Sequence, residues 1–278
     1  RGMVSKSMRT VAVLTVDIRV PHYARTAYTI EREFSRRGYE VILCNTGGDR
    51  AETLRYLQAV NQKQVDGIVL VGSVFDTICQ GAEMEKLLTG VPVVLANGKL
   101  DLPNAYSVTV DDKYGVSLAV EHLVARGRKN IYYIKDRDTD SAKSKRDGFL
   151  EAMRRNGLEF ADHVLEAGET LASGMETVQA LLAQGIVPDG IVCGEDLTAA
   201  GALKALLRAG LRVPGQVAVV GFNNSDYAHL CEPVLTSVDN KPEQVALLCV
   251  QLLESSIERS EAYSSVVLQP ELAQGETS

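Results

Sequence analysis

Short apolar runs rich in β-branched residues alternate with amphipathic segments of helical period along most of this chain. Such alternation is typical of an α/β fold in which helices connect parallel strands. The runs that predict strands are Thr10–Val16, Tyr39–Cys44, Gly67–Val71, Pro92–Ala96, Ser107–Val110, Asn130–Ile134, Gly190–Cys193, Val217–Gly221, Leu235–Val238 and Ser265–Gln269. The segments that predict helices are Ala24–Arg37, Ala51–Asn61, Glu83–Leu88, Lys113–Arg126, Ser141–Asn156, Gly174–Ala183, Leu197–Ala209 and Pro242–Ile257.

Glycines follow several of these helical segments, at the position where a left-handed residue commonly ends a helix. They are Gly38, Gly127, Gly157, Gly185 and Gly210. We interpret them as helix stops and not as parts of a ligand-binding loop.

The pattern favours two sheets over one. Gly98–Ala105 is polar and rich in turn residues, and the strand and helix cycle restarts at Tyr106. All the expected strands in one sheet would make it unusually wide, whereas two sheets of about five strands have an ordinary size. We therefore expect two similar lobes, each a parallel sheet flanked by helices. Ligands of open parallel sheets bind beyond the carboxyl ends of the strands, so we expect a cleft between the lobes that is lined by the loops there.

Composition limits the classes of partner that these residues can bind. The 278 residues include 29 Lys and Arg against 36 Asp and Glu, for a net charge of −7, and the basic residues form no stripe that would match duplex DNA. Any contact with DNA must then be made by another segment. Apolar runs are too short for a membrane span, so no membrane partner is expected.

The cysteines give no sign of a disulfide framework or a metal site. Cys44, Cys79, Cys193, Cys231 and Cys249 are odd in number, widely spaced and without a C-x-x-C pair. We interpret them as reduced core residues of a cytoplasmic protein. The chain has no signal-peptide pattern, and its start at Arg1 suggests a trimmed N-terminus.

No catalytic or nucleotide-binding motif is present, and neither a cofactor nor a metal is expected. Polar residues instead follow several expected strands, and His22 and Tyr23 stand just after the first one. Fixed donors and acceptors beside an aromatic face suit a hydroxyl-rich ligand. The alternative for each position is a helix N-cap. The residues at strand ends are Asp17, Ser73, Glu195, Asp196, Asn223 and Asn224.

Ordered segments over most of the chain resemble the lac repressor and galactose repressor family. Asp17–Ala24 (DIRVPHYA) resembles the family's D-x-x-N-P-F-F, and Ser141–Phe149 (SAKSKRDGF) resembles its S-x-x-R-x-x-G-F. Further similar segments are Val65–Leu70 (VDGIVL), Val91–Leu95 (VPVVL), Val110–Asp112 (VDD), Val120–Leu123 (VEHL), Leu211–Pro214 (LRVP), Val219–Phe222 (VVGF) and Leu235–Val238 (LTSV). Each segment alone is weak evidence of a resemblance, but the whole set in this order is specific for the family.

The resemblance implies a periplasmic-binding-protein-like type I fold whose chain passes between lobes three times, near Val110, near Asn240 and before Ser265. The N-terminal lobe would be residues 7–110 with 241–262, and the C-terminal lobe 111–240 with 263–278. Residues 1–6 resemble the end of the family's hinge. The helix-turn-helix headpiece that reads operator DNA as a dimer is absent from these residues, so we expect a homodimer that binds DNA only through that missing segment.

The family's ligand contacts, carried over by position, fall on Asp17, His22, Tyr23, Ser73, Lys145, Glu195, Asn223 and Asn240. Three of them depart from the usual sugar-binding set. Lys145 replaces an arginine and loses its planar fork, Glu195 stands where Asn is usual, and Asn223 stands where a carboxylate is usual. We therefore expect a sugar derivative, an amino sugar or another polar metabolite; a partner protein acting as co-regulator is an alternative.

The expected function is that of the ligand-sensing and dimerisation core of a transcription regulator. A ligand that bridges the lobes would stabilise a closed state and so change operator affinity. One rival is an extracytoplasmic sugar-binding protein of an ABC transporter. The other is an enzyme, which lacks support because no acid/base or nucleophile constellation is present.

Overall fold

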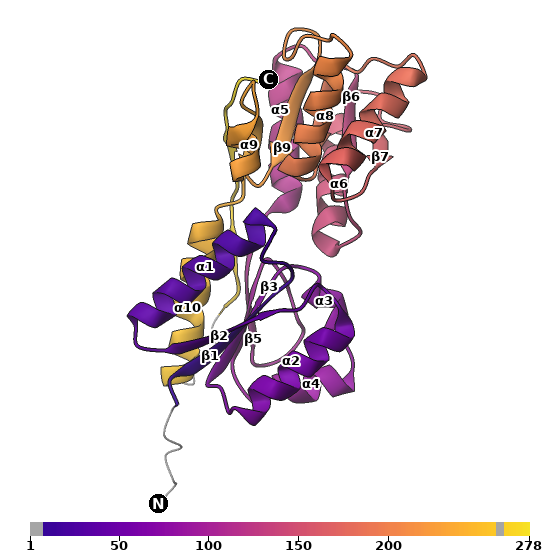
Figure 1. The fold of residues 1–278 in the computed structure, drawn as a ribbon. Coiled ribbons are helices and arrows are strands. Elements are labelled where there is room, and N and C mark those ends of the chain that lie inside the picture. Colours follow the sequence, from indigo (N-terminus) through magenta and orange to yellow (C-terminus); the bar gives the residue numbers. More distant parts are fainter. Residues whose placement is uncertain (1–7, 260–263) are drawn as a thin grey trace, which may run out of the picture. The chain divides into compact units, whose positions relative to one another are not determined.

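The computed structural model describes residues 8–259 and 264–278. The chain divides into two compact units, one made of Arg1–Val110 with Lys241–Leu268 and the other of Asp111–Asn240 with Gln269–Ser278. The expected hinge remnant at residues 1–6 lies outside the described residues. Each unit has its own sheet with helices packed on it, as Figure 1 shows.

The first unit contains a six-stranded sheet in the order β11-β5-β4-β3-β1-β2, and every neighbouring pair is parallel. We call it the first sheet. Its strands are β1 (Thr10–Thr15), β2 (Glu40–Asn45), β3 (Gly67–Val71), β4 (Val93–Ala96), β5 (Ala105–Val110) and β11 (Val266–Leu268). Its helices are α1 (Pro21–Arg36), α2 (Arg50–Gln62), α3 (Phe75–Ile78), α4 (Ala82–Leu88) and α10 (Pro242–Arg259).

Each face of the first sheet has its own core. Ile30 and Phe34 of α1 and Val245 of α10 pack with β-strand residues on one face, where the two helices lie side by side (Figure 1). Leu57 of α2 and Met84 of α4 pack on the other face. Both faces are therefore apolar, which explains why the strands are continuous hydrophobic runs and not alternating ones.

The second unit repeats this plan with a six-stranded sheet in the order β12-β10-β9-β8-β6-β7, in which only β12 is antiparallel to its neighbour. We call it the second sheet. Its strands are β6 (Ile131–Lys135), β7 (Val164–Glu166), β8 (Gly190–Cys193), β9 (Ala218–Phe222), β10 (Thr236–Asp239) and β12 (Glu271–Ala273). Its helices are α5 (Asp112–Ala125), α6 (Asp140–Arg155), α7 (Leu171–Ala183), α8 (Asp196–Arg208) and α9 (Asp226–Leu230).

The second sheet also has a core on each face. Val120 of α5 and Phe149 of α6 belong to the core on one face. Val178 of α7, Leu206 of α8 and Ala228 of α9 belong to the core on the other. The predicted α/β fold with two parallel sheets flanked by helices is confirmed, with six strands a sheet where about five were expected.

Local sequence signals account for the main helix boundaries. Pro21 occupies the first turn of α1, where its missing N–H costs nothing. Thr170 caps α7 in a reciprocal capping box with Ser173. The five glycines interpreted as helix stops all have a positive φ, between 64° and 81°, as a left-handed C-terminal residue requires.

Two expectations about the boundary between the units need correction. The break seen at Gly98–Ala105 does not separate the sheets, because β5 follows it and still pairs with β4 in the first sheet. The last passage between units follows Leu268 instead of preceding Ser265, because β11 pairs with β5. Residues 264–268 therefore belong with the first unit and not with the second.

Candidate functional site

Three neighbouring strands of the second sheet end in polar residues that join one hydrogen-bonded chain. Glu195 comes two residues after β8, Asn223 directly after β9, and Asn240 directly after β10. Asn240 Nδ2 donates to Asn223 Oδ1 at 2.8 Å, and Asn223 Nδ2 reaches Glu195 Oε1 at 3.5 Å. Because parallel strands share one carboxyl edge, residues far apart in sequence converge here.

Lys145 reaches the same edge from α6. Its Nζ donates to the carbonyl oxygen of Gly194 at 2.9 Å and lies 3.8 Å from the centre of the Phe222 ring. An ammonium over an aromatic face is attracted by the ring's negative centre. We call Lys145, Glu195, Asn223 and Asn240 the polar cluster; each has a relative exposure of 9% or less.

The loops that carry the cluster are fixed by Asp196. This fully buried carboxylate accepts hydrogen bonds from Ser225 N at 2.7 Å, from Ser225 Oγ at 2.8 Å and from Ser237 Oγ at 2.6 Å. It thus ties the start of α8 to the loop after β9 and to β10. We infer that Asp196 holds the strand ends in register and leaves Glu195 to face other partners.

Two carboxyl groups at this edge, Glu195 in the polar cluster and Asp196 beside it, resist ionisation. Burial raises the pKa of the Glu195 carboxyl to about 7, and the neighbouring Asp196 carboxylate adds to the rise. Burial also raises the pKa of Asp196 to about 6, although its three hydrogen bonds oppose the change. Around neutral pH the Glu195 carboxyl is therefore partly protonated, and a nearby charge would change its ionisation.

The expected residues of the first unit form a less connected set at the carboxyl edge of the first sheet. The Asp17 carboxylate accepts from Arg19 Nη2 at 2.8 Å and from the Arg19 amide at 2.9 Å. The other three residues differ in how deeply they are buried. Tyr23 is part of the core, whereas His22 and Ser73 are half-buried. The Tyr23 ring lies against Gly72, where a Cβ would come within 2.9 Å of Tyr23 Cε1.

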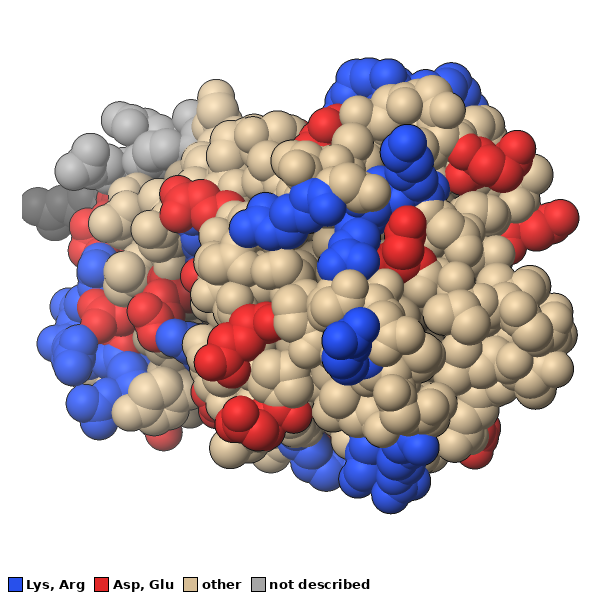
Figure 2. Space-filling view, turned by 90° about the horizontal axis from the view of Figure 1, so that it is seen from above, with Lys and Arg blue, Asp and Glu red and all other residues tan. Residues whose placement is uncertain are grey.

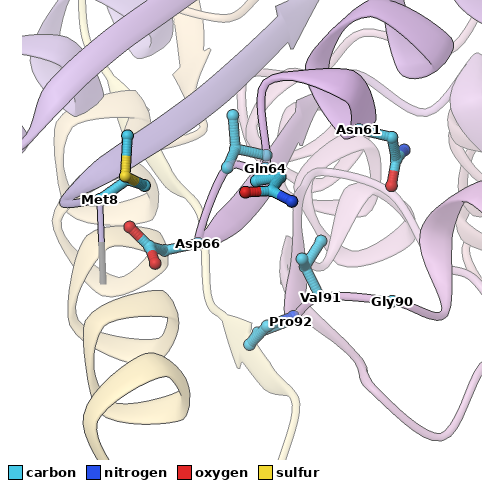
Figure 3. Close-up of a pocket in the computed structure, with 8 residues that line it drawn as sticks. Met8, Asn61, Gln64, Asp66, Gly90, Val91 and Pro92 are labelled. Atoms are coloured by element: carbon cyan, nitrogen blue, oxygen red, sulfur yellow. The ribbon is translucent and has the colours of Figure 1, made fainter. Parts of the chain in front are cut away.

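A surface pocket of about 470 Å³ lies at the opposite, amino edge of the first sheet (Figure 3). Its lining includes Met8, Asn61, Gln64, Asp66 and Pro92, and none of the expected site residues. Two of its polar side chains are used by the fold itself: Asp66 Oδ2 accepts from Thr10 N at 2.9 Å, and Asn61 Nδ2 donates to Leu57 O and Leu87 O. We therefore base the functional site on the strand ends.

Surface charge gives no basic footprint on the face drawn in Figure 2, where Lys and Arg side chains are interspersed with Asp and Glu. Within the part of the chain that the structure describes, no helix has the length and apolar character needed to cross a membrane. The same described residues contain no group of three or more His, Cys, Asp or Glu side chains arranged to hold a metal ion.

Two structural roles at the strand ends escaped the site prediction. Asp136, which follows β6 directly, is 5% exposed and accepts from Arg137 Nε at 2.9 Å. Phe222 provides the ring under Lys145. Asp136 carried the same signal as the predicted residues, an acidic residue shortly after an apolar strand, whereas Phe222 was noted only as the last residue of the VVGF segment.

Comparisons with known proteins agree with this architecture. Residues 120–278 match a family described as a periplasmic binding protein-like domain. The chain is 31% identical to an HTH-type transcriptional regulator of Lachnoclostridium phytofermentans, over 91% of this chain and 77% of that protein. It is 32% identical to catabolite control protein A of Priestia megaterium, over 97% of this chain and 81% of that protein.

Solved structures give the same result. The cellobiose complex of the transcriptional regulator CelR is 25% identical, with a TM-score of 0.83 over 99% of this chain and 86% of the other. The lac repressor dimer bound to operator and an anti-inducer is 21% identical, with a TM-score of 0.87 over 98% of this chain and 95% of the other, and shows the fold. The chain belongs to the lac repressor/galactose repressor family.

The lac repressor/galactose repressor family consists of transcription regulators and not of enzymes, so no catalytic role is assigned to the buried acids at the strand ends. The chain corresponds to the effector-binding core of such a regulator. The rival of an extracytoplasmic solute-binding protein is not favoured, because the relatives are named as transcription regulators.

Proposed function

We propose that this core senses a small polar metabolite and that binding changes the affinity of the regulator for operator DNA. The observation that carries the proposal is the polar cluster, in which a lysine, a glutamate and two asparagines are buried together at the ends of parallel strands. Buried polar groups cost free energy unless they are hydrogen-bonded. If this edge of the sheet had only a structural role, apolar side chains would be less costly there. A ligand with several donors and acceptors would give the four polar side chains hydrogen-bond partners.

In the proposed mechanism one ligand contacts side chains of both units. Lys145, Glu195, Asn223 and Asn240 would bind it from the second unit, and Asp17, His22, Tyr23 and Ser73 from the first. Binding then favours the arrangement of the units in which both sets are engaged, by an amount equal to the difference in affinity between the two arrangements. Operator contacts would be made by a helix-turn-helix segment outside this chain.

The proposed regulator is a homodimer. The support comes from large apolar side chains left exposed in each unit: Tyr28 on α1 and Leu43 on β2 are 63% and 46% exposed, and Leu230 on α9 is 80% exposed. Side chains of this kind are common in interfaces. The lac repressor, which shares the fold, is a dimer on its operator.

A thermal-shift screen over sugars, sugar phosphates, nucleosides and amino sugars tests the proposed function. A specific ligand at a hundred times its dissociation constant should add about 2.7 kcal/mol to the free energy of unfolding. Lys145→Ala should abolish that gain, since its ammonium is the cationic member of the polar cluster and is held at the strand ends by Gly194 and Phe222.

Lys143→Ala is the matched control, because Lys143 lies two residues away on the same helix and is half exposed in an ion pair with Asp140. It should leave the ligand-induced shift unchanged. A ligand whose effect survives Lys145→Ala, Glu195→Gln and Asn223→Gly would bind elsewhere and would contradict the proposed site.

A further inference from the structure

We propose that the effector carries a protonated amine and that this amine binds beside Glu195. The inference rests on the proposed function and names the chemical class of its ligand. It is argued from the second unit alone, from the charges, the hydrogen bonds and one buried hydroxyl group around Gly194.

The first observation is that Glu195 has no hydrogen bond or ion pair to a cation among the described residues, although the charge of Arg137 acts on it electrostatically. Its Oε2 accepts from the Leu197 amide at 2.8 Å, and its Oε1 is 3.5 Å from Asn223 Nδ2; both donors are neutral. Among the residues that the structure describes, no Lys, Arg or His nitrogen lies within 4.0 Å of its carboxyl oxygens. A carboxylate that is 7% exposed would ordinarily be paired with a cation.

The cations nearby are already engaged by other groups. Arg137 pairs with the carboxylate of Asp136 at 2.9 Å. Lys145 donates to Gly194 O and lies on the Phe222 ring. A second buried lysine, Lys135, pairs with Glu166 at 3.2 Å. Three buried acids, Asp136, Glu195 and Asp196, share this edge with cations that already have partners, so the local field favours a positive ligand group.

The second, independent observation is the hydroxyl of Tyr133. The residue is fully buried, and its Oη has no hydrogen-bond partner in the described part of the chain. A Cβ placed on Gly194 would lie 3.0 Å from this Oη and 2.6 Å from Asp136 Oδ1. The two oxygens therefore meet at the residue that precedes Glu195.

A primary ammonium matches this set of groups. It presents three N–H donors and no acceptor, and the edge offers a carboxylate oxygen of Glu195 together with the unpartnered Tyr133 oxygen. Charge-assisted hydrogen bonds to a carboxylate are about twice as strong as neutral ones. A neutral hydroxyl would leave the Glu195 charge uncompensated, which explains why a glutamate suits an amine better than a plain sugar.

Paired ligands test the inference by isothermal titration. D-glucosamine, D-galactosamine and D-mannosamine are each compared with the neutral parent sugar and with the N-acetylated form, in the same buffer at pH 7. At least one amine should bind at least tenfold more tightly than both of its neutral counterparts.

Proton release gives a second readout on the unmodified chain. Because burial raises the pKa of Glu195 to about 7, an ammonium that binds the ionised form should release roughly half a proton at pH 7. Titrations in buffers of different ionisation enthalpy measure that release. Glu195→Gln should remove both the release and the preference for the amine, whereas Glu176→Gln, an exposed acid on α7, should change neither.

Each remaining outcome is decisive. Neutral or anionic metabolites from the wider screen that bind as tightly as the amines, or an amine that binds without proton release and equally well to Glu195→Gln, would overturn the inference and leave the proposed function standing. A chain that binds no metabolite of any class would contradict the proposed function itself.

Discussion

At the scale of single residues, Glu195 combines two roles. Its side chain is the N-cap of α8, where it accepts from the Leu197 amide, and it is also part of the buried polar cluster. A serine or an aspartate would cap the helix equally well. The longer acidic side chain is therefore explained by the cluster and not by the helix.

The first prediction concerns the pH dependence of stability. The pKa of Glu195 is about 7 in the folded chain against an ordinary 4.5, so the folded state binds more protons and the free energy of unfolding falls as pH rises from 4.5 to 7. Glu195→Gln removes this penalty and keeps an oxygen for the cap. We expect the variant to be more stable than the wild type at pH 8, by about 3 kcal/mol at most, and to converge with it near pH 4.5.

Urea denaturation at pH 8 and at pH 4.5 measures this difference. Glu176→Gln removes the same charge from an exposed position and should change stability by less than about 0.5 kcal/mol at both pH values. A wild type that is more stable than Glu195→Gln at pH 8 would mean that the carboxylate has a stabilising partner within the fold.

The sequence predicts candidate site residues but not the contacts that their side chains make. Position after a strand was enough to select Glu195 and Asn223, because parallel strands collect their following residues at one edge, whereas Asn240 and Lys145 were selected only through the family resemblance. It could not separate a cap from a ligand contact: Asp17 caps no helix, since Val20 is the N-cap of α1, whereas Glu195 does cap one. The hydroxyl of Tyr133 was hidden because it stands within a strand.

At the scale of elements, glycines set how closely helices pack in the second unit. A Cβ on Gly174 of α7 would come within 2.3 Å of the Thr198 carbonyl oxygen, and one on Gly201 of α8 within 2.2 Å of the Leu171 carbonyl oxygen. A Cβ on Gly148 of α6 would likewise come within 2.3 Å of the Lys113 carbonyl oxygen. Backbone meets backbone at these points, so neither side can yield by a change of rotamer.

The second prediction follows from this contact. Gly174→Ala and Gly201→Ala should each lower the free energy of unfolding by about 1–3 kcal/mol, because α7 and α8 must move apart to admit the methyl group. Gly90→Ala is the control: nothing lies within 4 Å of its added Cβ and its φ is not positive, so stability should be unchanged or slightly higher. Thermal unfolding of the three variants measures the effect; equal stability of Gly174→Ala and Gly90→Ala would contradict the close approach.

The helices and strands show which sequence patterns are sufficient to predict an element. Gly67–Val71 and Gly190–Cys193 were predicted with their observed bounds, because fully buried strands are unbroken apolar runs. The pattern along the chain does not predict β7, β12, α3 and α9. The two strands lie at sheet edges and have only exposed or half-buried residues, and the two helices span five residues or fewer, so none of the four has a local pattern and their formation depends on tertiary contacts.

At the scale of the whole molecule, each unit has a core on both faces of its sheet and therefore contains what it needs to fold around its own strands. Each of the four core clusters lies within one unit. The large exposed apolar side chains are then the features that folding of the single chain leaves unexplained, and Leu230 is the most exposed of those described.

The third prediction tests Leu230 as part of the proposed dimer interface. Leu230 ends α9, and α9 packs against α8, which exposes Leu207 to 41%. Sedimentation velocity should show a dimer of the wild type at tens of micromolar chain. Leu230→Glu should weaken dimerisation by about 2 kcal/mol or more, because burying an unpaired carboxylate in an interface costs more than the lost leucine contact.

Val187→Glu is the control for Leu230→Glu. Val187 is also apolar and 51% exposed, but it lies in the loop after α7, away from α9 in the sequence and in the fold. It should leave the dimer intact, and both variants should unfold at the wild-type temperature when measured on the monomer. A dimer that survives Leu230→Glu but is broken by Val187→Glu would move the interface to the α7 side of the second unit; a wild type that sediments as a monomer would contradict the proposed homodimer.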